Sequence, residues 1–148
     1  MSASAAKDDV VLELTHTFDA PRERVFDAWL DPKELASWVG PRGVSAEVPL
    51  LEAKAGGRYR IQMLTPDKSN PAVGGIFREI KRPERLVLTW MWESEKVETL
   101  ITLTFKTVGK QTEIKLRQEG FSAKERRDSH HNGWSGSFDK LAERLAKK

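Results

Sequence analysis

The sequence predicts an α+β fold in which a seven-stranded, curved antiparallel sheet surrounds a long C-terminal helix, with two short helices after the first strand. Three observations predict it. Residues 120–148 have the pattern of one long amphipathic helix, residues 44–119 alternate between apolar and polar positions, and residues 20–38 contain two helix-start signals. The order is therefore strand, two helices, six strands, long helix.

The first strand is predicted at residues 10–18, where apolar and polar side chains alternate. Pro21 opens a short helix, because proline suits the first helical position. Asp31, followed by Pro32 and by Glu34 at the third position, is the cap of a second short helix. This helix pair has no basic face, which argues against a DNA-binding use.

Six strands are predicted after the turn at Gly40-Pro41-Arg42-Gly43. Near the end of this region the two faces separate clearly, since Ile101, Leu103 and Phe105 face one way and polar residues face the other. Such a pattern is typical of an antiparallel sheet that is covered on one side only. The six strands are expected at residues 44–51, 58–64, 74–81, 85–93, 97–107 and 112–119.

The last helix changes its polarity along its length. Ser122 and Glu125 form the pattern of a capping box at its start. Its second half carries an apolar stripe made of Trp134, Phe138, Leu141 and Leu145. Projected backwards, the stripe reaches Arg127, with His130 and His131 on its two flanks. We therefore expect the second half to pack on the core and the first half to meet a ligand or solvent.

The predicted dimensions favour a sheet that encloses space. A helix of about 25 residues is ~37 Å long. Seven strands spaced ~4.8 Å apart span ~30 Å before curvature. The helix can therefore cross the whole sheet, and a sheet that curls around it, closed at one end by the two short helices, encloses a volume.

Composition narrows the possible classes of protein. We expect residues 1–9 to form a flexible tail and residues 10–148 a single domain. There are no cysteines, no apolar run long enough to span a membrane and no secretory signal pattern, so we expect a cytoplasmic protein. The net charge of +3 comes from 25 basic and 22 acidic residues that are interspersed, which does not favour a nucleic-acid partner.

A series of short segments gives the chain a family resemblance that begins near residue 10. The most distinctive are residues 75–80 (Gly-Ile-Phe-Arg-Glu-Ile) and 83–90 (Pro-Glu-Arg-Leu-Val-Leu-Thr-Trp). Others are residues 18–21, 25–26, 28–29, 31–32, 38–41, 56–59, 66–67, 119–121, 127–128, 130 and 133–134. Together they resemble the family named after the activator of the heat-shock protein 90 ATPase, within the START/Bet v 1-like (SRPBCC) superfamily. One departure is Arg82, where relatives often have a second proline.

This resemblance implies the helix-grip fold, with an apolar cavity between the sheet and the C-terminal helix. It does not imply one activity, because relatives include lipid and hormone carriers, cyclases, toxin-sequestering proteins and co-chaperone domains, and a shared fold leaves function to the site. Large apolar residues could line the cavity or simply fill the core. The candidate cavity residues are Phe26, Trp29, Trp38, Tyr59, Met63, Phe77, Trp90, Trp92, Leu103, Arg127, His130, Trp134 and Phe138.

Three polar residues allow more than one interpretation. His130 and His131 could be solvated helix residues, or one of them could lie beside Arg127 at the cavity mouth as a polar contact for a ligand; His130 matches the family pattern. Adjacent histidines diverge by ~100° on a helix, so we expect no metal site. Glu79 is buried if it shares the inward face of Phe77, and exposed if Ile76 and Ile80 point inward. A buried Glu79 would need a charged partner.

Three functional hypotheses follow. The first is the binding of a small apolar or amphipathic molecule in the internal cavity. The second is a co-chaperone-like role in stress response, in which the chain contacts a heat-shock protein 90 homologue through an exposed patch. The third is a cyclase-like or hydrolase-like enzyme that uses His130 or Glu79 as acid or base, although no pair of residues that activate one another stands out. We expect no cofactor, and a monomer or homodimer.

Overall fold

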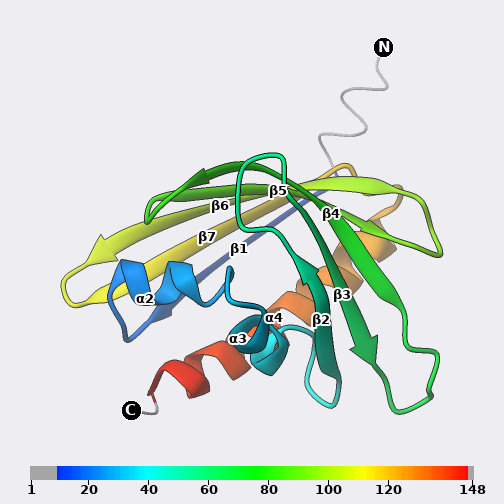
Figure 1. Ribbon diagram of the computed structural model, residues 1–148, viewed down its shortest axis with the longest axis horizontal. Helices are drawn as coiled ribbons and strands as arrows, with labels where there is room; N and C mark the ends of the chain where they lie inside the picture. Colours follow the sequence, from blue (N-terminus) through cyan, green and yellow to red (C-terminus); the bar gives the residue numbers. More distant parts are fainter. Residues whose placement is uncertain (1–9, 147–148) are drawn as a thin grey trace.

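A computed structural model describes residues 10–146, so the predicted tail at residues 1–9 lies outside the described residues. The chain begins with strand β1 (Val11–Phe18), followed by the short helices α2 (Arg22–Asp27) and α3 (Pro32–Trp38). Six strands and one long helix come next (Figure 1). These are β2 (Ser45–Leu51), β3 (Arg58–Leu64), β4 (Ala72–Lys81), β5 (Arg85–Trp92), β6 (Glu98–Val108), β7 (Gln111–Glu119) and α4 (Lys124–Ala146).

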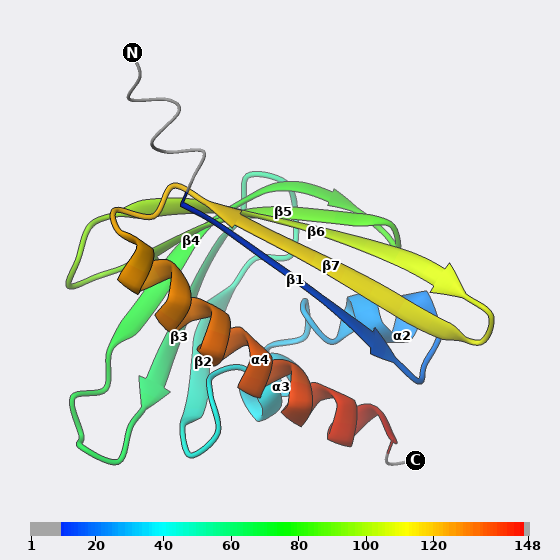
Figure 2. The ribbon, with the colours of Figure 1, turned by 180° about the vertical axis from the view of Figure 1, so that it is seen from behind.

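The strands form one antiparallel sheet in the order β1-β7-β6-β5-β4-β3-β2. The first strand therefore pairs with the last, and β2 forms the opposite edge. The sheet curves, and α4 runs diagonally across its inner side with α3 beside it (Figures 1 and 2). The predicted α+β helix-grip architecture is confirmed, with strand boundaries within two residues of those expected.

The predicted helix cap at Asp31 and the predicted alternation along β6 are both present in the structure. The Asp31 carboxylate caps α3 by accepting hydrogen bonds from the backbone N–H groups of Lys33 and Glu34, at 2.9 and 3.1 Å. Along β6 the odd-numbered positions from Thr99 to Phe105 are buried, while the positions between them are partly exposed. A strand that alternates in this way has one face on the core and one face toward water.

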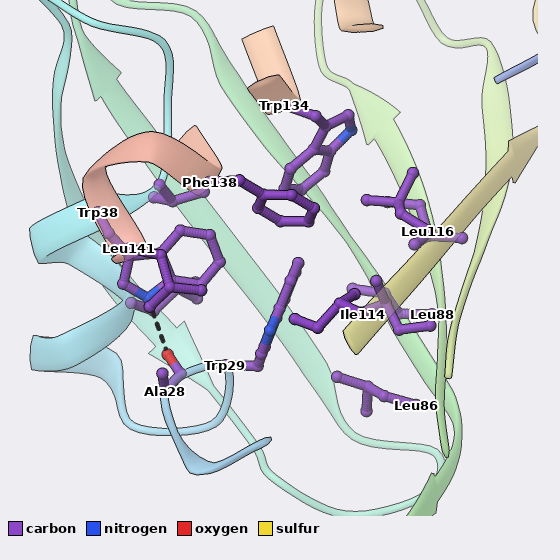
Figure 3. Close-up of a cluster of buried hydrophobic side chains, with 14 of the residues drawn as sticks. Ala28, Trp29, Trp38, Leu86, Leu88, Ile114, Leu116, Trp134, Phe138 and Leu141 are labelled. Atoms are coloured by element: carbon purple, nitrogen blue, oxygen red, sulfur yellow. Dashed lines mark hydrogen bonds between the residues drawn. The ribbon is translucent and has the colours of Figure 1, made fainter. Parts of the chain in front are cut away.

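The core lies between the sheet, the short helices and the second half of α4 (Figure 3). Trp29 contacts Trp38, Trp134 and Phe138, with ring centroids 4.7, 5.7 and 6.1 Å apart. The Trp38 indole N–H donates to the Ala28 carbonyl oxygen at 3.1 Å, so this fully buried indole keeps its hydrogen bond. Aromatic packing thus joins the short helices to α4.

The loop at residues 39–44 fastens α4 to the sheet edge. The Lys140 ammonium donates to the carbonyl oxygen of Val44 at 3.0 Å and approaches those of Val39 and Pro41 at 3.5 Å. Burial, followed by the nearby Arg42 charge, lowers the pKa of Lys140. Gly136 lets the helix come close, because a Cβ there would lie 3.1 Å from the Arg42 nitrogen.

Candidate functional site

A pocket of about 310 Å³ lies between the first half of α4 and the sheet. Its walls come from α4, β3, β5, the loop at residues 39–44, the loop between β3 and β4 and the loop that follows β5. The lining residues are mostly apolar, with polar groups at the helix side, as is typical of sites for small molecules. They are Val39, Gly40, Pro41, Val44, Met63, Thr65, Pro71, Trp90, Trp92, Ser94, Glu95, Arg126, Ser129, His130, Gly133, Trp134 and Ser137.

Helical geometry explains which side of α4 faces the pocket. At about 100° per residue, His130 and Arg126 lie about 40° and 80° from the direction of Trp134, and Gly133 lies about 100° away on the same side. Arg127 lies within about 20° of the apolar stripe itself. The pocket is therefore beside the buried stripe, on the flank that faces β3 and β5, and not directly under it.

Three indoles form the aromatic part of the pocket wall. The rings of Trp90 and Trp134 have centroids 5.0 Å apart, and Trp92 meets Trp90 edge-on at 5.8 Å. The Trp134 N–H donates to the Gln118 side-chain oxygen at 2.9 Å, and the Gln118 amide nitrogen in turn donates to the Thr99 hydroxyl at 2.8 Å. This buried network holds Trp134 in place.

His130 is held in one neutral form by two hydrogen bonds. Its Nε2 accepts from the Trp92 indole N–H at 2.8 Å, and its Nδ1 lies 2.7 Å from the Arg126 carbonyl oxygen. An indole only donates and a carbonyl only accepts, so Nδ1 carries the proton and Nε2 does not. Burial lowers the pKa of His130, against the hydrogen bond to the Arg126 carbonyl, which raises it. Both ring nitrogens are thus engaged.

Charge in the pocket wall is balanced. The only charged residues among those lining the pocket are Glu95 and Arg126, and their side chains form an ion pair at 2.7 Å between the loop after β5 and α4. The Arg126 Nε atom is buried without a hydrogen-bond partner. Since His130 is neutral, the lining has no net charge, and the ion pair lies beside the Trp92–His130 hydrogen bond.

Beneath the pocket lies a second, much smaller cavity of about 10 Å³. Val39, Trp90 and Trp134 line both spaces and so lie between them. The inner cavity is otherwise apolar, with Trp29, Tyr59 and Phe77 in its wall. Space of this size holds about one water molecule. The larger pocket is therefore the only one of the two that could receive an organic molecule.

Gly133 leaves room in the pocket wall that a side chain would occupy. A Cβ placed there would have no neighbouring heavy atom within 4 Å, apart from its own helix and chain neighbours. Glycine inside a helix is less favourable than alanine by roughly 0.8–1 kcal/mol. At Gly136, about one turn later, a Cβ would be in tight contact with the loop, at 3.1 Å from the Arg42 backbone nitrogen, whereas packing does not require Gly133.

The predicted cavity residues separate into four groups. Met63, Trp90, Trp92, His130 and Trp134 line the pocket. Trp29, Tyr59 and Phe77 line only the inner cavity. Phe26, Trp38, Leu103 and Phe138 are buried in the core and line neither space. Arg127 is outside the lining, with its Nε donating to the Asp128 carboxylate at 3.0 Å.

Glu79 is not in the cavity, although Phe77 points inward and is 2% exposed. The pairing of β4 with β5 shifts between Phe77 and Glu79, so the alternation that would have buried Glu79 is interrupted. Its side chain is 43% exposed and accepts a hydrogen bond from Arg85 at 3.0 Å. Glu79 therefore belongs to a surface ion pair.

Sequence reasoning missed several residues of the pocket, chiefly Arg126, Glu95 and Gly133. Two signals could have found Arg126 and Gly133. Arg126 is one helical turn before His130, and a glycine in the interior of a helical pattern usually has a packing or functional reason. Glu95 is in the loop after β5, and its pairing with Arg126, 31 positions later, had no local sign in the sequence.

Residues 10–146 contain neither a helix that could span a membrane nor a side-chain cluster that could hold a metal ion. No helix in this range is long and apolar enough to cross a membrane. No group of three or more histidine, aspartate or glutamate side chains in the same range is arranged to hold a metal ion.

Comparison with known proteins shows which family the chain is similar to. The sequence profile described as "Activator of Hsp90 ATPase homolog 1-like protein" matches residues 19–146. None of the curated proteins matches the sequence significantly.

Solved structures agree with the profile. A crystal structure of a protein from Chromobacterium violaceum is 26% identical, with a TM-score of 0.88 over 95% of this chain and 99% of that one. The AHSA1 protein of Silicibacter pomeroyi is 25% identical, with a TM-score of 0.80 over 92% and 97% of the two chains. A protein from Arthrobacter aurescens, 20% identical, shares the fold with a TM-score of 0.85 over 95% of this chain and 88% of that one. The chain therefore belongs to the family of proteins similar to activator of Hsp90 ATPase homolog 1.

Proposed function

We propose that this protein binds a small apolar or amphipathic molecule in the pocket between the sheet and the first half of α4. The observation that carries the proposal is the open wall at Gly133. A helical glycine that packing does not require lowers stability, and here it leaves space beside three indoles. The pocket volume is at the lower end of the range for small-molecule sites.

The geometry favours binding over catalysis. The two candidates for acid or base were His130 and Glu79. Both nitrogens of His130 are engaged in hydrogen bonds, so neither is free to exchange a proton with a ligand. Glu79 is paired with Arg85 at the surface, away from the pocket lining. A binding module therefore fits the pocket better than an enzyme that uses either residue.

The co-chaperone hypothesis receives less support from the described surface. A docking site for another protein would need a large apolar or charged patch. Among residues 10–146 the exposed large hydrophobic residues are Ile76 and Val108, on different strands, with exposed fractions of 38% and 45%. Pull-down of an Hsp90 homologue from the source cell would test this hypothesis directly.

The ligand-binding proposal is tested by screening lipids, polyketides and aromatic compounds by thermal shift and native mass spectrometry. A hit should be lost in Gly133→Leu, which fills the open wall, with affinity reduced about tenfold or more, equivalent to about 1.4 kcal/mol. Asn132→Leu is the matched control, because its side chain is exposed on the neighbouring position and is not part of the pocket lining. The absence of any hit, or equal binding by both variants, would refute the proposal.

A further inference from the structure

The wall beside the first half of α4 separates the pocket from a second, much smaller space. This recess has a volume of about 10 Å³ and is lined by residues of α4, β5 and β6 and of the segments that precede α4 and β6. The residues that line both spaces lie between them and are called the dividing wall. They are Trp90, Trp92, Glu95, Arg126 and His130.

Two polar contacts hold the two sides of the dividing wall together. The Trp92 indole N–H donates to Nε2 of His130 at 2.8 Å, and the Arg126 guanidinium lies 2.7 Å from the Glu95 carboxylate. Phe121, which lines only the recess, packs its ring on His130 with centroids 4.9 Å apart. Of these groups only the imidazole ordinarily titrates near neutral pH. The contact across the wall at His130 therefore depends on the charge of that ring.

The hydrogen bond between Trp92 and His130 exists only while Nε2 is unprotonated. An indole has a donor and no acceptor, and a protonated imidazole has donors on both nitrogens. Proton uptake by Nε2 therefore sets two N–H groups against each other. Nδ1 can keep its bond to the Arg126 carbonyl oxygen, because it donates in both forms. The bond that is lost is the one that crosses the wall, and the bond within α4 remains.

Proton uptake also changes the charge of the pocket lining. Glu95 and Arg126 cancel each other, so the lining is neutral while His130 is neutral. Among the described residues, these two are the charged groups that act on the ring, since Trp92 of β5 and Phe121 before α4 do not titrate. A protonated His130 adds one positive charge, whichever cation then pairs with Glu95. A charge beside an apolar molecule is unfavourable, because that molecule replaces water that would solvate the charge.

The surroundings of His130 set the pH range of this change. Burial lowers its pKa below the ordinary value of about 6.5, against the hydrogen bond to the Arg126 carbonyl and the charge of Glu95, which raise it. The ring is therefore neutral at pH 7.5 and takes up a proton in mild acid. The side chain is partly exposed, so a proton can reach it while the core stays folded.

We infer that protonation of His130 opens the dividing wall and gives the pocket lining a positive charge, so that a neutral molecule held there is released in mild acid. The release rests on the proposed function, whereas the change in the wall does not. The coupling is reciprocal: a neutral molecule that prefers the closed wall also keeps Nε2 of His130 unprotonated.

The wall is tested without a ligand, by two-dimensional proton–nitrogen NMR of the full chain between pH 7.5 and pH 5.0. The indole N–H signal of Trp92, identified by its absence in Trp92→Phe, should shift with the same midpoint as the ring nitrogens of His130. The Trp134 signal is the internal control, because its N–H donates to Gln118, which does not titrate. In His130→Gln the Trp92 signal should stay in place, since glutamine can still accept from the indole.

Release is tested with two fluorescent probes that keep their charge over this pH range. Nile red is neutral, and anilinonaphthalene sulfonate is an anion. From pH 7.5 to pH 5.0 the affinity of wild type for Nile red should fall about threefold or more, the factor that corresponds to one net hydrogen bond. The ratio of the sulfonate affinity to the Nile red affinity should rise, because only the anion gains from the added charge.

Two variants assign the change to one imidazole. His130→Gln should lose the pH dependence of the affinity ratio. His131→Gln is the matched control, because it removes the neighbouring imidazole, which is exposed and lines neither space, and it should behave as wild type. The remaining titrating groups are the same in both variants and cancel in the comparison.

Each outcome decides the inference. A Trp92 signal that does not follow the His130 titration, or that shifts equally in His130→Gln, would overturn it. A Nile red affinity that does not change with pH in wild type, or that falls equally in His130→Gln, would overturn the release. If the Trp92 signal follows His130 but neither probe nor any screened compound binds, the proposed function fails and the change in the wall stands. Should His130→Gln fail to fold, the wild-type spectra decide, with Trp134 as reference.

Discussion

The two halves of α4 are held in different ways, although they form one continuous helix. In the second half Trp134, Ser137, Phe138, Leu141 and Leu145 are buried against the core. In the first half, residues 124–133, no side chain is fully buried, and the contacts to the sheet side are those of Arg126 and His130. The second half therefore packs on the core, and the first half forms part of the pocket wall.

The two halves also differ in the kind of contact that stabilises them. Apolar burial stabilises the second half in proportion to the area removed from water. The contacts of the first half include a partly exposed ion pair, a hydrogen bond from Trp92 to His130 and the packing of the His130 ring on Phe121, at 4.9 Å between centroids. Contacts of this kind contribute less than a fully buried apolar face. Substitutions in the two halves should therefore change the free energy of unfolding by amounts that differ in size and in sign.

The largest effect is expected for Phe138→Ala in the second half. Phe138 is fully buried against Phe18, Trp29, Trp38 and Trp134, so its removal should leave a cavity and lower the free energy of unfolding by about 3–5 kcal/mol. Urea denaturation followed by circular dichroism measures the change. A loss below about 1 kcal/mol would contradict the assignment of this half to the core.

A smaller loss is expected for Gly136→Val. Its Cβ would lie 3.1 Å from the Arg42 nitrogen and 3.3 Å from the Pro41 Cα, and the branched side chain adds further contacts. Forcing atoms into such a contact typically costs about 1–3 kcal/mol. The same denaturation experiment measures it, and a variant as stable as wild type would show that the loop yields easily.

The opposite sign is expected for Gly133→Ala in the first half. Because a Cβ there meets no neighbour within 4 Å, the substitution should raise the free energy of unfolding by about 0.8–1 kcal/mol through helix propensity alone. Thermal and urea unfolding should both show the gain. Ser135→Ala is the control, because Ser135 is in the same helix but does not line the pocket, and it shows the effect of an ordinary helical substitution. A destabilised Gly133→Ala would mean that the wall has no spare space.

The smallest effect is a pH dependence that comes from His130. Burial holds the pKa of His130 below its ordinary value of about 6.5, which the unfolded chain should show, so the unfolded state takes up a proton first as the pH falls. Stability from this group is complete above about pH 6.5 and declines below it. Protonation also places a donor on Nε2 against the Trp92 N–H, which breaks that contact.

Comparison with His130→Gln measures this effect, because glutamine can still accept from Trp92 but does not titrate. Urea denaturation at pH 7.5 and at pH 5.5 should show a larger loss of stability for wild type than for the variant. Identical pH dependence of the two proteins would show that the histidine is not held neutral. The other titrating groups contribute equally to both and cancel.

Several elements were predictable because their signals are local. The Asp31 cap, the alternation along β6 and the stripe through Trp134 and Leu145 each depend on residues a few positions apart, and each is found where it was expected. The order of these elements predicted a curved antiparallel sheet around the last helix, and the family resemblance implied the helix-grip fold.

The site was less predictable, because its walls come together from distant segments. The stripe correctly separated the packed half of α4 from the polar half, but it pointed to Arg127, whereas Arg126 lines the pocket. Which flank of a helix faces a cavity depends on where β3 and β5 end in space, and a helical projection has no information about that.

Sequence alone determined the elements, their order and the change of polarity along α4, because hydrophobic periodicity and capping act over a few residues. Tertiary structure decided the rest. A bulge in β4 turned Glu79 outward, although Phe77 points inward. The hydrogen bond from the Trp92 N–H fixed His130 in a neutral form. The loop at Pro41 comes close to Gly136, whereas the space around Gly133 is open. These outcomes depend on contacts between segments far apart in the chain, and only the folded geometry brings those segments together.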